Sequence, residues 1–267
     1  MSEPMLHTNL TREDVGGYAF LPGSPQRVAR IAQYLEHPQF LRVNREHETY
    51  AGTLEGERVI VTSTGMGGPS AVICLEELSR LGVHTFLRVG TCSTTSPTVR
   101  RGDLVIPMAA VRMEGTSDHY APPEYPAVPD LTMLDGLRCA AKKTGYPTHV
   151  GVVVTRDGFY TQNEAEDKPA GYLLAPRWEA YKAMGAIASE MECSALFIAG
   201  ASREVRVGAV MVCATNYGHY GHGENHYPGD DELRAVETAV EAMRLQILAD
   251  HSGVAFDGYC RKSKDLP

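Results

Sequence analysis

Short apolar runs alternate with segments of helical periodicity along the first third of the chain. Residues 18–21, 58–63 and 84–89 have the composition of buried strands. Residues 26–32 and 69–81 carry apolar side chains at the spacing of an amphipathic helix. The pattern predicts strands and helices in strict alternation, which is typical of an α/β fold.

The alternation continues to the last helix. Strands are predicted at 103–106, 150–155 and 207–213, and helices at 192–201 and 230–250. The run 207–213 is almost entirely apolar, as strands of parallel sheets are when helices cover both faces. We therefore expect a single α/β domain with a sheet flanked by helices.

Three segments depart from this order. Residues 118–130 are rich in proline and aromatic side chains, and residues 162–177 are polar with scattered glycine and proline. We expect both to be long loops, which in compact domains are usually functional. Residues 251–267 have little apolar pattern, so the domain is expected to span 1–250 and to leave a loosely held tail.

Composition narrows the class of protein. No run approaches the ~20 apolar residues of a membrane span, and the first residues lack the basic start and apolar core of a signal peptide. The six cysteines form no C-x-x-C pair, and several lie in apolar segments. The net charge of −8 opposes nucleic-acid binding. We expect a soluble cytoplasmic protein with no nucleic-acid or membrane partner.

A glycine-rich turn and an isolated arginine suggest an anion site. The turn at 63–70 precedes a predicted helix, whose N-terminus carries partial positive charge. Arg88 lies in an apolar strand, where an unpaired charge is costly and a phosphate would be a natural partner. Arg27 follows a Pro-Gly-Ser-Pro turn, and Arg45 lies in a polar segment. Each arginine could instead form an ordinary ion pair.

Two further groups could carry chemistry. Glu190 and Glu192 flank Met191 just before a predicted helix. They could interact favourably with the helix dipole, or one carboxylate could accept hydrogen bonds from sugar hydroxyls while the methionine packs on the sugar. The spacing does not decide between these two interpretations.

Residues 219–226 contain three histidines and a glutamate, but no second ligand cluster accompanies them. We therefore expect this segment to be a loop that covers a pocket, and not a metal centre.

Taken in order, these motifs resemble a known family. Segments 23–28, 44–46, 63–70, 86–91 and 190–192 occur in the order found in purine and uridine phosphorylases, which share the nucleoside phosphorylase-I fold. Within that family the chain is most similar to the uridine-cleaving subgroup, whose pattern 124–130 also matches. The resemblance runs from about His7 to the last helix.

The resemblance implies a barrel-like mixed sheet and reversible phosphorolysis, in which a nucleoside and inorganic phosphate give a free base and ribose 1-phosphate. It implies a pentosyltransferase of nucleoside catabolism and nucleotide salvage that needs no cofactor. It also implies a homo-oligomer, either a hexamer built as a trimer of dimers or at least a dimer with shared active sites, with K⁺ at the dimer interface.

The resemblance also implies roles for individual residues. Arg88 and Glu192 would be the catalytic residues. Phosphate would be held by Gly23, Arg27, Arg88, Thr91 and, from a neighbouring subunit, Arg45. Ribose would be held by Met191, Glu190, Glu192 and the neighbour's His7. A monovalent cation would be held by Glu46, Met66 through its carbonyl, and Ser70.

The base-binding end departs from the family pattern. After Phe159, the positions of a uracil-binding glutamine and arginine are occupied by Asn163 and Ala165, although Gln162 could replace the glutamine if the loop shifts by one residue. Tyr217 stands where a second arginine is expected.

Asn216 lies near the position of the aspartate that protonates the base in purine-cleaving relatives, but an amide cannot act as an acid. We expect a pyrimidine nucleoside, uridine above all, as the substrate. The alternatives are a purine or modified-base nucleoside contacted by Asn216, a nucleosidase that uses water, and a non-catalytic nucleoside-binding protein.

Overall fold

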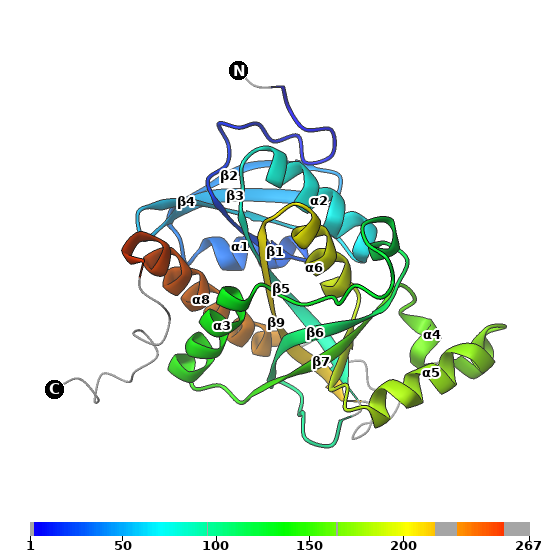
Figure 1. Ribbon diagram of the computed structural model, residues 1–267. Coiled ribbons are helices and arrows are strands. Elements are labelled where there is room, and N and C mark those ends of the chain that lie inside the picture. Colours follow the sequence, from blue (N-terminus) through cyan, green and yellow to red (C-terminus); the bar gives the residue numbers. More distant parts are fainter. Residues whose placement is uncertain (1–2, 95, 164, 217–228, 254–267) are drawn as a thin grey trace.

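A mixed sheet that closes partly on itself forms the centre of the molecule (Figure 1). The computed structural model describes residues 3–94, 96–163, 165–216 and 229–253. Within these ranges nine strands are paired: β1 (Tyr18–Pro22), β2 (Glu36–Asn44), β3 (His47–Leu54), β4 (Glu57–Thr62), β5 (Thr85–Thr94), β6 (Leu104–Met113), β7 (Thr148–Arg156), β8 (Ala188–Glu190) and β9 (Arg206–Asn216).

Strand β5 joins the two parts of the sheet. The order is β2-β3-β4-β1-β5-β8-β7-β6-β9, and β9 pairs back onto β5 in parallel over its whole length. Five strands therefore form a closed ring, and β1, β4, β3 and β2 extend from it as an open arm. Parallel and antiparallel pairs both occur, which confirms the predicted mixed, barrel-like sheet.

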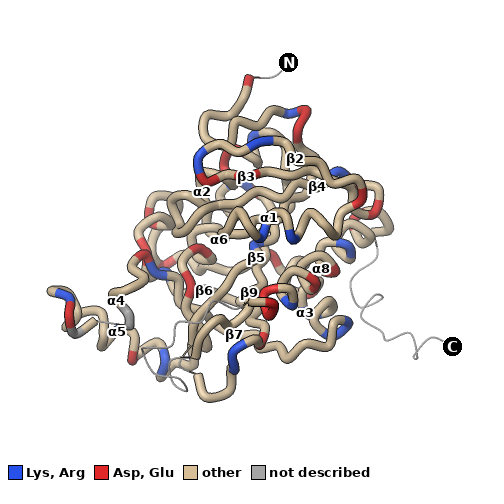
Figure 2. The backbone as a smooth tube through the Cα atoms, turned by 180° about the vertical axis from the view of Figure 1, so that it is seen from behind, with Lys and Arg blue, Asp and Glu red and all other residues tan. Residues whose placement is uncertain are grey.

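Helices cover both faces of the sheet (Figures 1 and 2). The described helices are α1 (Pro25–Ala32), α2 (Gly68–Arg80), α3 (Leu131–Thr144), α4 (Tyr160–Asn163), α5 (Gly171–Ala183), α6 (Cys193–Ser202) and α8 (Glu232–Ser252). One core cluster contains α2 and α6, and the other contains α1, α3 and α8. Because side chains alternate along a strand, Phe86 of β5 enters the first cluster while Leu87 enters the second.

The predicted strands and helices are all present, but the prediction missed several others. The prediction of a loop at 162–177 is wrong over its second half, because helix α5 begins at Gly171 and includes Pro176. Helix α3 was missed although Asp130 caps its start, accepting hydrogen bonds from two backbone N–H groups, and Gly145 ends it with a φ of 77°. The β2–β3 hairpin was missed because β2 is largely exposed and lacks an apolar alternation.

The predicted loop at 118–130 is confirmed apart from a short 3₁₀ turn at Ser117–His119 and a bridge between Ala110 and Ala127. Helix α8 runs to Ser252, and residues 254–267 of the predicted tail lie outside the described residues.

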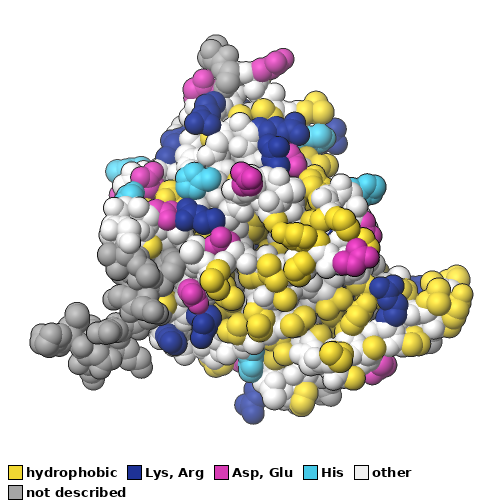
Figure 3. All heavy atoms as spheres, in the orientation of Figure 1, with side chains coloured by type: hydrophobic (Ala, Val, Ile, Leu, Met, Phe, Trp, Pro, Cys, Tyr) yellow, Lys and Arg dark blue, Asp and Glu magenta, His cyan; other side chains and the backbone are white. Residues whose placement is uncertain are grey.

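Surface composition follows the fold. Basic and acidic residues are interspersed along the chain (Figure 2). Hydrophobic side chains gather over the part of the surface that carries α6, β6 and α5 (Figure 3). Exposed hydrophobic residues in β6, in the loop after it and in α5 include Met108, Tyr125, Val128 and Tyr172.

No described helix is long and apolar enough to cross a membrane. Cys74, Cys92, Cys193 and Cys213 are free and buried, as expected for cysteines in apolar segments.

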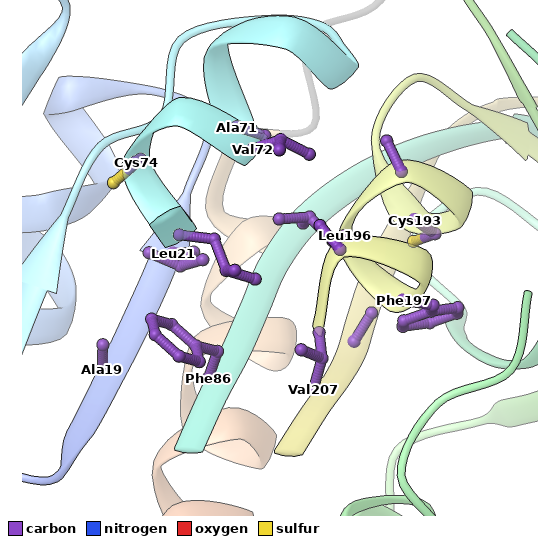
Figure 4. Packing of buried hydrophobic residues seen from close by; sticks show 14 of the residues in the cluster. Ala19, Leu21, Ala71, Val72, Cys74, Phe86, Cys193, Leu196, Phe197 and Val207 are labelled. Carbon is purple, nitrogen blue, oxygen red and sulfur yellow. The ribbon is translucent and has the colours of Figure 1, made fainter. Parts of the chain in front are cut away.

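The contact of α6 with α2 and the sheet gives a test of the core (Figure 4). Leu196 of α6 is fully buried in the same core cluster as Phe86 and Val207. Leu196→Ala should lower the free energy of unfolding by about 2–5 kcal/mol, because it removes apolar contacts and leaves a cavity. Leu173→Ala on the exposed side of α5 is the matched control and should change stability by no more than about 0.5 kcal/mol. Urea unfolding measures both, and equal effects would contradict the packing described.

Candidate active site

A cavity of about 730 Å³ lies where the carboxyl ends of the ring strands meet the turns after β1 and β4. Strand ends are where sheets of this kind bind ligands. The cavity brings together nine of the predicted site residues: Gly23, Arg27, Met66, Arg88, Thr91, Phe159, Glu190, Met191 and Glu192.

The first end of the cavity is formed by the start of α1. Ser24 caps this helix by accepting a hydrogen bond from the backbone N–H of Gln26. Arg27 in the first turn is buried; its Nε donates to Glu232, and its Nη1 donates to the Val89 carbonyl at 2.9 Å. A helix N-terminus beside a fixed guanidinium is suited to an anion.

Arg88 is paired but not saturated. Its Nη2 donates to Glu192, and its Nε lies 3.6 Å from a Glu190 oxygen, too far for a hydrogen bond. Among the described residues, neither Nε nor Nη1 has a hydrogen-bond acceptor. Gly90 leaves room for the guanidinium, since a Cβ there would lie 2.9 Å from Nη2. Burial would lower the pKa of Arg88, but Glu192 and Glu190 raise it overall, so Arg88 remains a cation.

The two glutamates of the 190–192 motif differ in their contacts. Glu190 Oε2 accepts hydrogen bonds from the backbone N–H groups of Glu192 and Cys193 at 2.7 and 2.9 Å, and Oε1 accepts from Thr155. Glu190 therefore fixes the start of α6, as the helix-dipole interpretation predicts. Both of its oxygens are used in this way, and the position of Glu190 on the cavity wall is its remaining link to a ligand.

Glu192 is the carboxylate that is left for a ligand. It accepts from Arg88 and, at 2.6 Å, from the backbone N–H of Gly67. Each carboxylate oxygen retains a further lone pair for a hydroxyl donor. Burial raises the pKa of Glu192, and Arg88 opposes that rise. The cavity thus places an unsaturated cation and a hydroxyl acceptor in direct contact.

Two residues assigned to a neighbouring subunit do not line the cavity of this chain. Arg45 is exposed in the turn between β2 and β3, with a φ of 53°. His7 lies beside α2, where its Nδ1 is 2.7 Å from Glu77 Oε1. Their predicted roles required a second copy and stay predictions.

The base-binding predictions are only partly covered by the structure. Phe159 lines the cavity and is 40% exposed. Gln162 and Asn163 belong to α4, and their side chains lie outside the described part. Tyr217 and the histidine-rich segment 219–226 also lie outside the described residues. Asn216 is buried away from the cavity wall, and its Nδ2 donates to the carbonyls of Ser96 and Val99.

The predicted cation site has a compatible set of oxygens. Ser70 Oγ lies 2.6 Å from Glu46 Oε1 and 2.5 Å from the Thr64 carbonyl. One hydroxyl proton cannot serve both oxygens, so this group has more acceptors than donors. The hydrogen bond from Ser70 lowers the pKa of Glu46 and keeps it charged. The group contains a single carboxylate, and within the described ranges no cluster of three His, Cys, Asp or Glu residues could hold a metal.

Comparison with known proteins agrees with this geometry. The sequence model of the Phosphorylase superfamily matches residues 18–249. The chain belongs to the phosphorylase superfamily. It is 43% identical over 244 residues to uridine phosphorylase of Treponema pallidum, covering 91% of this chain and 95% of that protein. It is 39% identical to uridine phosphorylase of Escherichia coli, covering 90% and 97%. It is 35% identical to guanosine phosphorylase of Halorubrum lacusprofundi, covering 91% and 96%.

Several wall residues of this phosphorylase-superfamily chain were not predicted: Ser24, Pro25, Gly65, Cys92, Ser93, Arg156, Ser189, Ala214 and Thr215. Most are small and carry no chemical signal in the sequence. Arg156 does carry one, because a charge at the end of an apolar strand is the same signal that identified Arg88.

Glu77 gives a test of how the His7 segment is held. Its oxygens accept hydrogen bonds from His7 and Thr8 at 2.7 to 2.9 Å. Burial alone would raise the pKa of Glu77, but these hydrogen bonds lower it overall. The contribution of the Glu77 carboxylate to the stability of the folded protein is therefore fully present above the ordinary glutamate pKa. It is lost as pH falls through the lower pKa that Glu77 has in the folded protein.

Glu77→Gln should reduce the free energy of unfolding at pH 7 by about 1–3 kcal/mol. The difference from the wild type should shrink as pH falls below 4.5, the ordinary pKa of the group. Urea unfolding at several pH values measures this, with the exposed Glu179→Gln as control. A difference that does not depend on pH would show that the charge of Glu77 plays no part.

Proposed function

We propose that the protein is a nucleoside phosphorylase, with uridine as the leading substrate. It would cleave the N-glycosidic bond with inorganic phosphate to give the base and ribose 1-phosphate, reversibly. One observation carries the proposal: the buried Arg88 has two nitrogens without acceptors among the described residues and is bonded to Glu192 in the same cavity. An anion site and a sugar-hydroxyl site are therefore adjacent, as the attack of phosphate on C1′ requires.

Different residues of the cavity would bind the phosphate and the ribose in this reaction. The start of α1, with Gly23 and Arg27, and Arg88 and Thr91 on β5 would hold the phosphate. Glu192 would accept hydrogen bonds from ribose hydroxyls, and Met191 would pack against the sugar. As the bond to the base breaks, positive charge develops on the ribose, and the bound phosphate stabilises that charge before it attacks. Positioning and electrostatics then lower the barrier without a covalent protein nucleophile.

The charge balance of the cavity supports an oligomer with shared sites. Arg27 and Arg88 are already paired with Glu232 and Glu192, so a phosphate dianion would bring charge that these cations alone do not balance. Arg45 from a second copy would add a cation, and that copy's His7 would reach the 5′-hydroxyl. The exposed apolar side chains in Figure 3 are suited to burial between subunits. We propose at least a dimer, and a hexamer as the full assembly.

The proposal also includes a second candidate substrate and a cellular location. The relative named guanosine phosphorylase makes a purine nucleoside the second candidate substrate. We also propose that the enzyme acts in the cytoplasm, in nucleoside catabolism and salvage.

Arg88 provides the decisive test of the proposed reaction. Purified protein is incubated with uridine, thymidine, cytidine, inosine, guanosine or adenosine, with and without phosphate, and the released base is measured. The wild type should release base only with phosphate. Arg88→Ala should lower that rate by about 100-fold or more, since it removes charge at the reacting centre.

Arg138→Ala on the surface of α3 is the matched control and should retain full activity. Arg88→Lys covers the case in which the alanine variant fails to fold. Release of base that ignores phosphate would identify a nucleosidase, and binding without release would identify a non-catalytic binder.

We also propose that Glu46, Ser70 and the Met66 carbonyl hold K⁺, which prefers hard oxygen ligands of this kind. The melting temperature should be about 2–4 °C higher in potassium chloride than in choline chloride at equal ionic strength. Ser70→Ala should abolish the difference. A potassium effect that persists in this variant would exclude the proposed ligands.

A further inference from the structure

We infer that Arg156 is a specificity-determining residue that selects nucleosides whose base carries a ring carbonyl, such as uracil or a 6-oxopurine. The inference rests on the proposed phosphorylase function and goes further, because it assigns the base-binding end of the cavity to a residue outside the motifs that identified the family.

The order of strands around the ring places Arg156 at the base end. Going from β5 through β8 to β7, the wall carries first Arg88, then Glu190, and then Arg156 at the end of β7. Arg88 belongs to the phosphate position, and Glu190 ends β8 two residues before the proposed ribose acceptor Glu192. Phe159, three residues after Arg156, lines the same cavity. A nucleoside whose sugar lies on Glu192 therefore extends its base toward Arg156 and Phe159.

Arg156 is held in a fixed orientation. Its Nε donates to Ser189 Oγ at 2.7 Å, and its Nη1 donates to the backbone carbonyls of Gly158 and Phe159. The guanidinium carbon lies 5.4 Å from the centre of the Phe159 ring. The side chain is almost fully buried and still forms part of the cavity wall. A cation fixed in this way is preorganised, so it need not reorient when a ligand binds.

The charge of Arg156 suits the chemistry of the departing base. The base takes the electron pair of the glycosidic bond, and in uracil or a 6-oxopurine that charge spreads onto carbonyl oxygens. A guanidinium beside the base stabilises this charge through its own positive charge, and it does so most in the transition state. Adenine has no carbonyl to receive this interaction. Both named activities among the relatives, on uridine and on guanosine, concern bases with ring carbonyls.

The position of Arg156 also accounts for the departures in the sequence. Ala165 and Tyr217 stand where the resemblance implies two base-binding arginines. Arg156 ends β7, the strand that precedes the segment of Ala165, and it brings a positive charge to the cavity wall.

The experiment compares leaving groups of different acidity. Phosphorolysis of uridine and of 5-fluorouridine is measured for the wild type, Arg156→Met and Arg156→Lys. The fluorinated base is the more acidic and needs less stabilisation as it leaves. Arg156→Met should lower kcat/KM for uridine by about 100-fold. The loss of kcat/KM for 5-fluorouridine should be several-fold smaller than the loss for uridine. Arg156→Lys, which keeps the charge, should restore most of the activity on uridine.

Inosine and adenosine give a second comparison, in which Arg156→Met should reduce the preference for inosine. Arg138→Met removes an exposed arginine of α3 and is the matched control. It should leave the ratio of the two uridines unchanged.

The outcomes separate the two proposals. Equal losses on uridine and 5-fluorouridine would show that Arg156 only supports the turn at Gly158, and would overturn its role in selectivity. Unchanged activity would overturn it as well. Absence of phosphate-dependent cleavage by the wild type would overturn the proposed function itself. If Arg156→Met does not fold, the same ratio measured in Arg156→Gln decides, because this variant also removes the charge and a purely structural arginine would give equal losses on the two uridines.

Discussion

The buried contact between Arg88 and Glu192 is the interaction on which the site depends. Each charge would be very costly to bury alone, and each partner favours the charged form of the other. The pair also joins two parts of the fold, since Arg88 belongs to β5 and Glu192 begins α6. Glu190 and the Gly67 backbone complete the arrangement by holding α6 and Glu192 in place. The result is a rigid cation on the cavity wall, with two nitrogens that have no acceptor among the described residues.

The closed part of the sheet explains why so many functional groups converge. Strand β5 pairs with β1, β8 and β9, so its carboxyl end is surrounded by the ends of other strands. Arg88, Glu190 and Arg156 come from three strands that are far apart in sequence and consecutive around the ring. The small residues on the wall leave the space that a ligand needs. The same closure leaves the β2–β3 arm projecting, with Arg45 and Glu46 exposed in its turn, in a position suited to a second copy.

The sequence predicted the fold well because its main signal is strong. Continuous apolar strands and amphipathic helices form most of the ring and of both core clusters, and the predicted ones were found, although β5 and β6 run beyond their predicted ends. Most of the missed elements lack that signal; α3, which buries Met133 and Leu137, is the exception. Strand β2 is mostly exposed, α5 contains a proline, and β8 has only three residues, Ala188–Glu190, whose pairing with β7 and β5 is a tertiary contact. Local patterns carry no information on such pairing.

The sequence by itself determined the chemical inventory: a glycine-rich turn, arginines in apolar strands, and two carboxylates before a helix. It also determined the family, because the order of these motifs is specific. Only the tertiary structure decided which groups meet. It assigned Glu190 to the helix start and Glu192 to the cavity, removed Asn216 from the cavity wall, and brought Arg156 to that wall. The physical reason is that a side chain's role depends on its partners, and partners from distant strands are fixed only when the sheet closes.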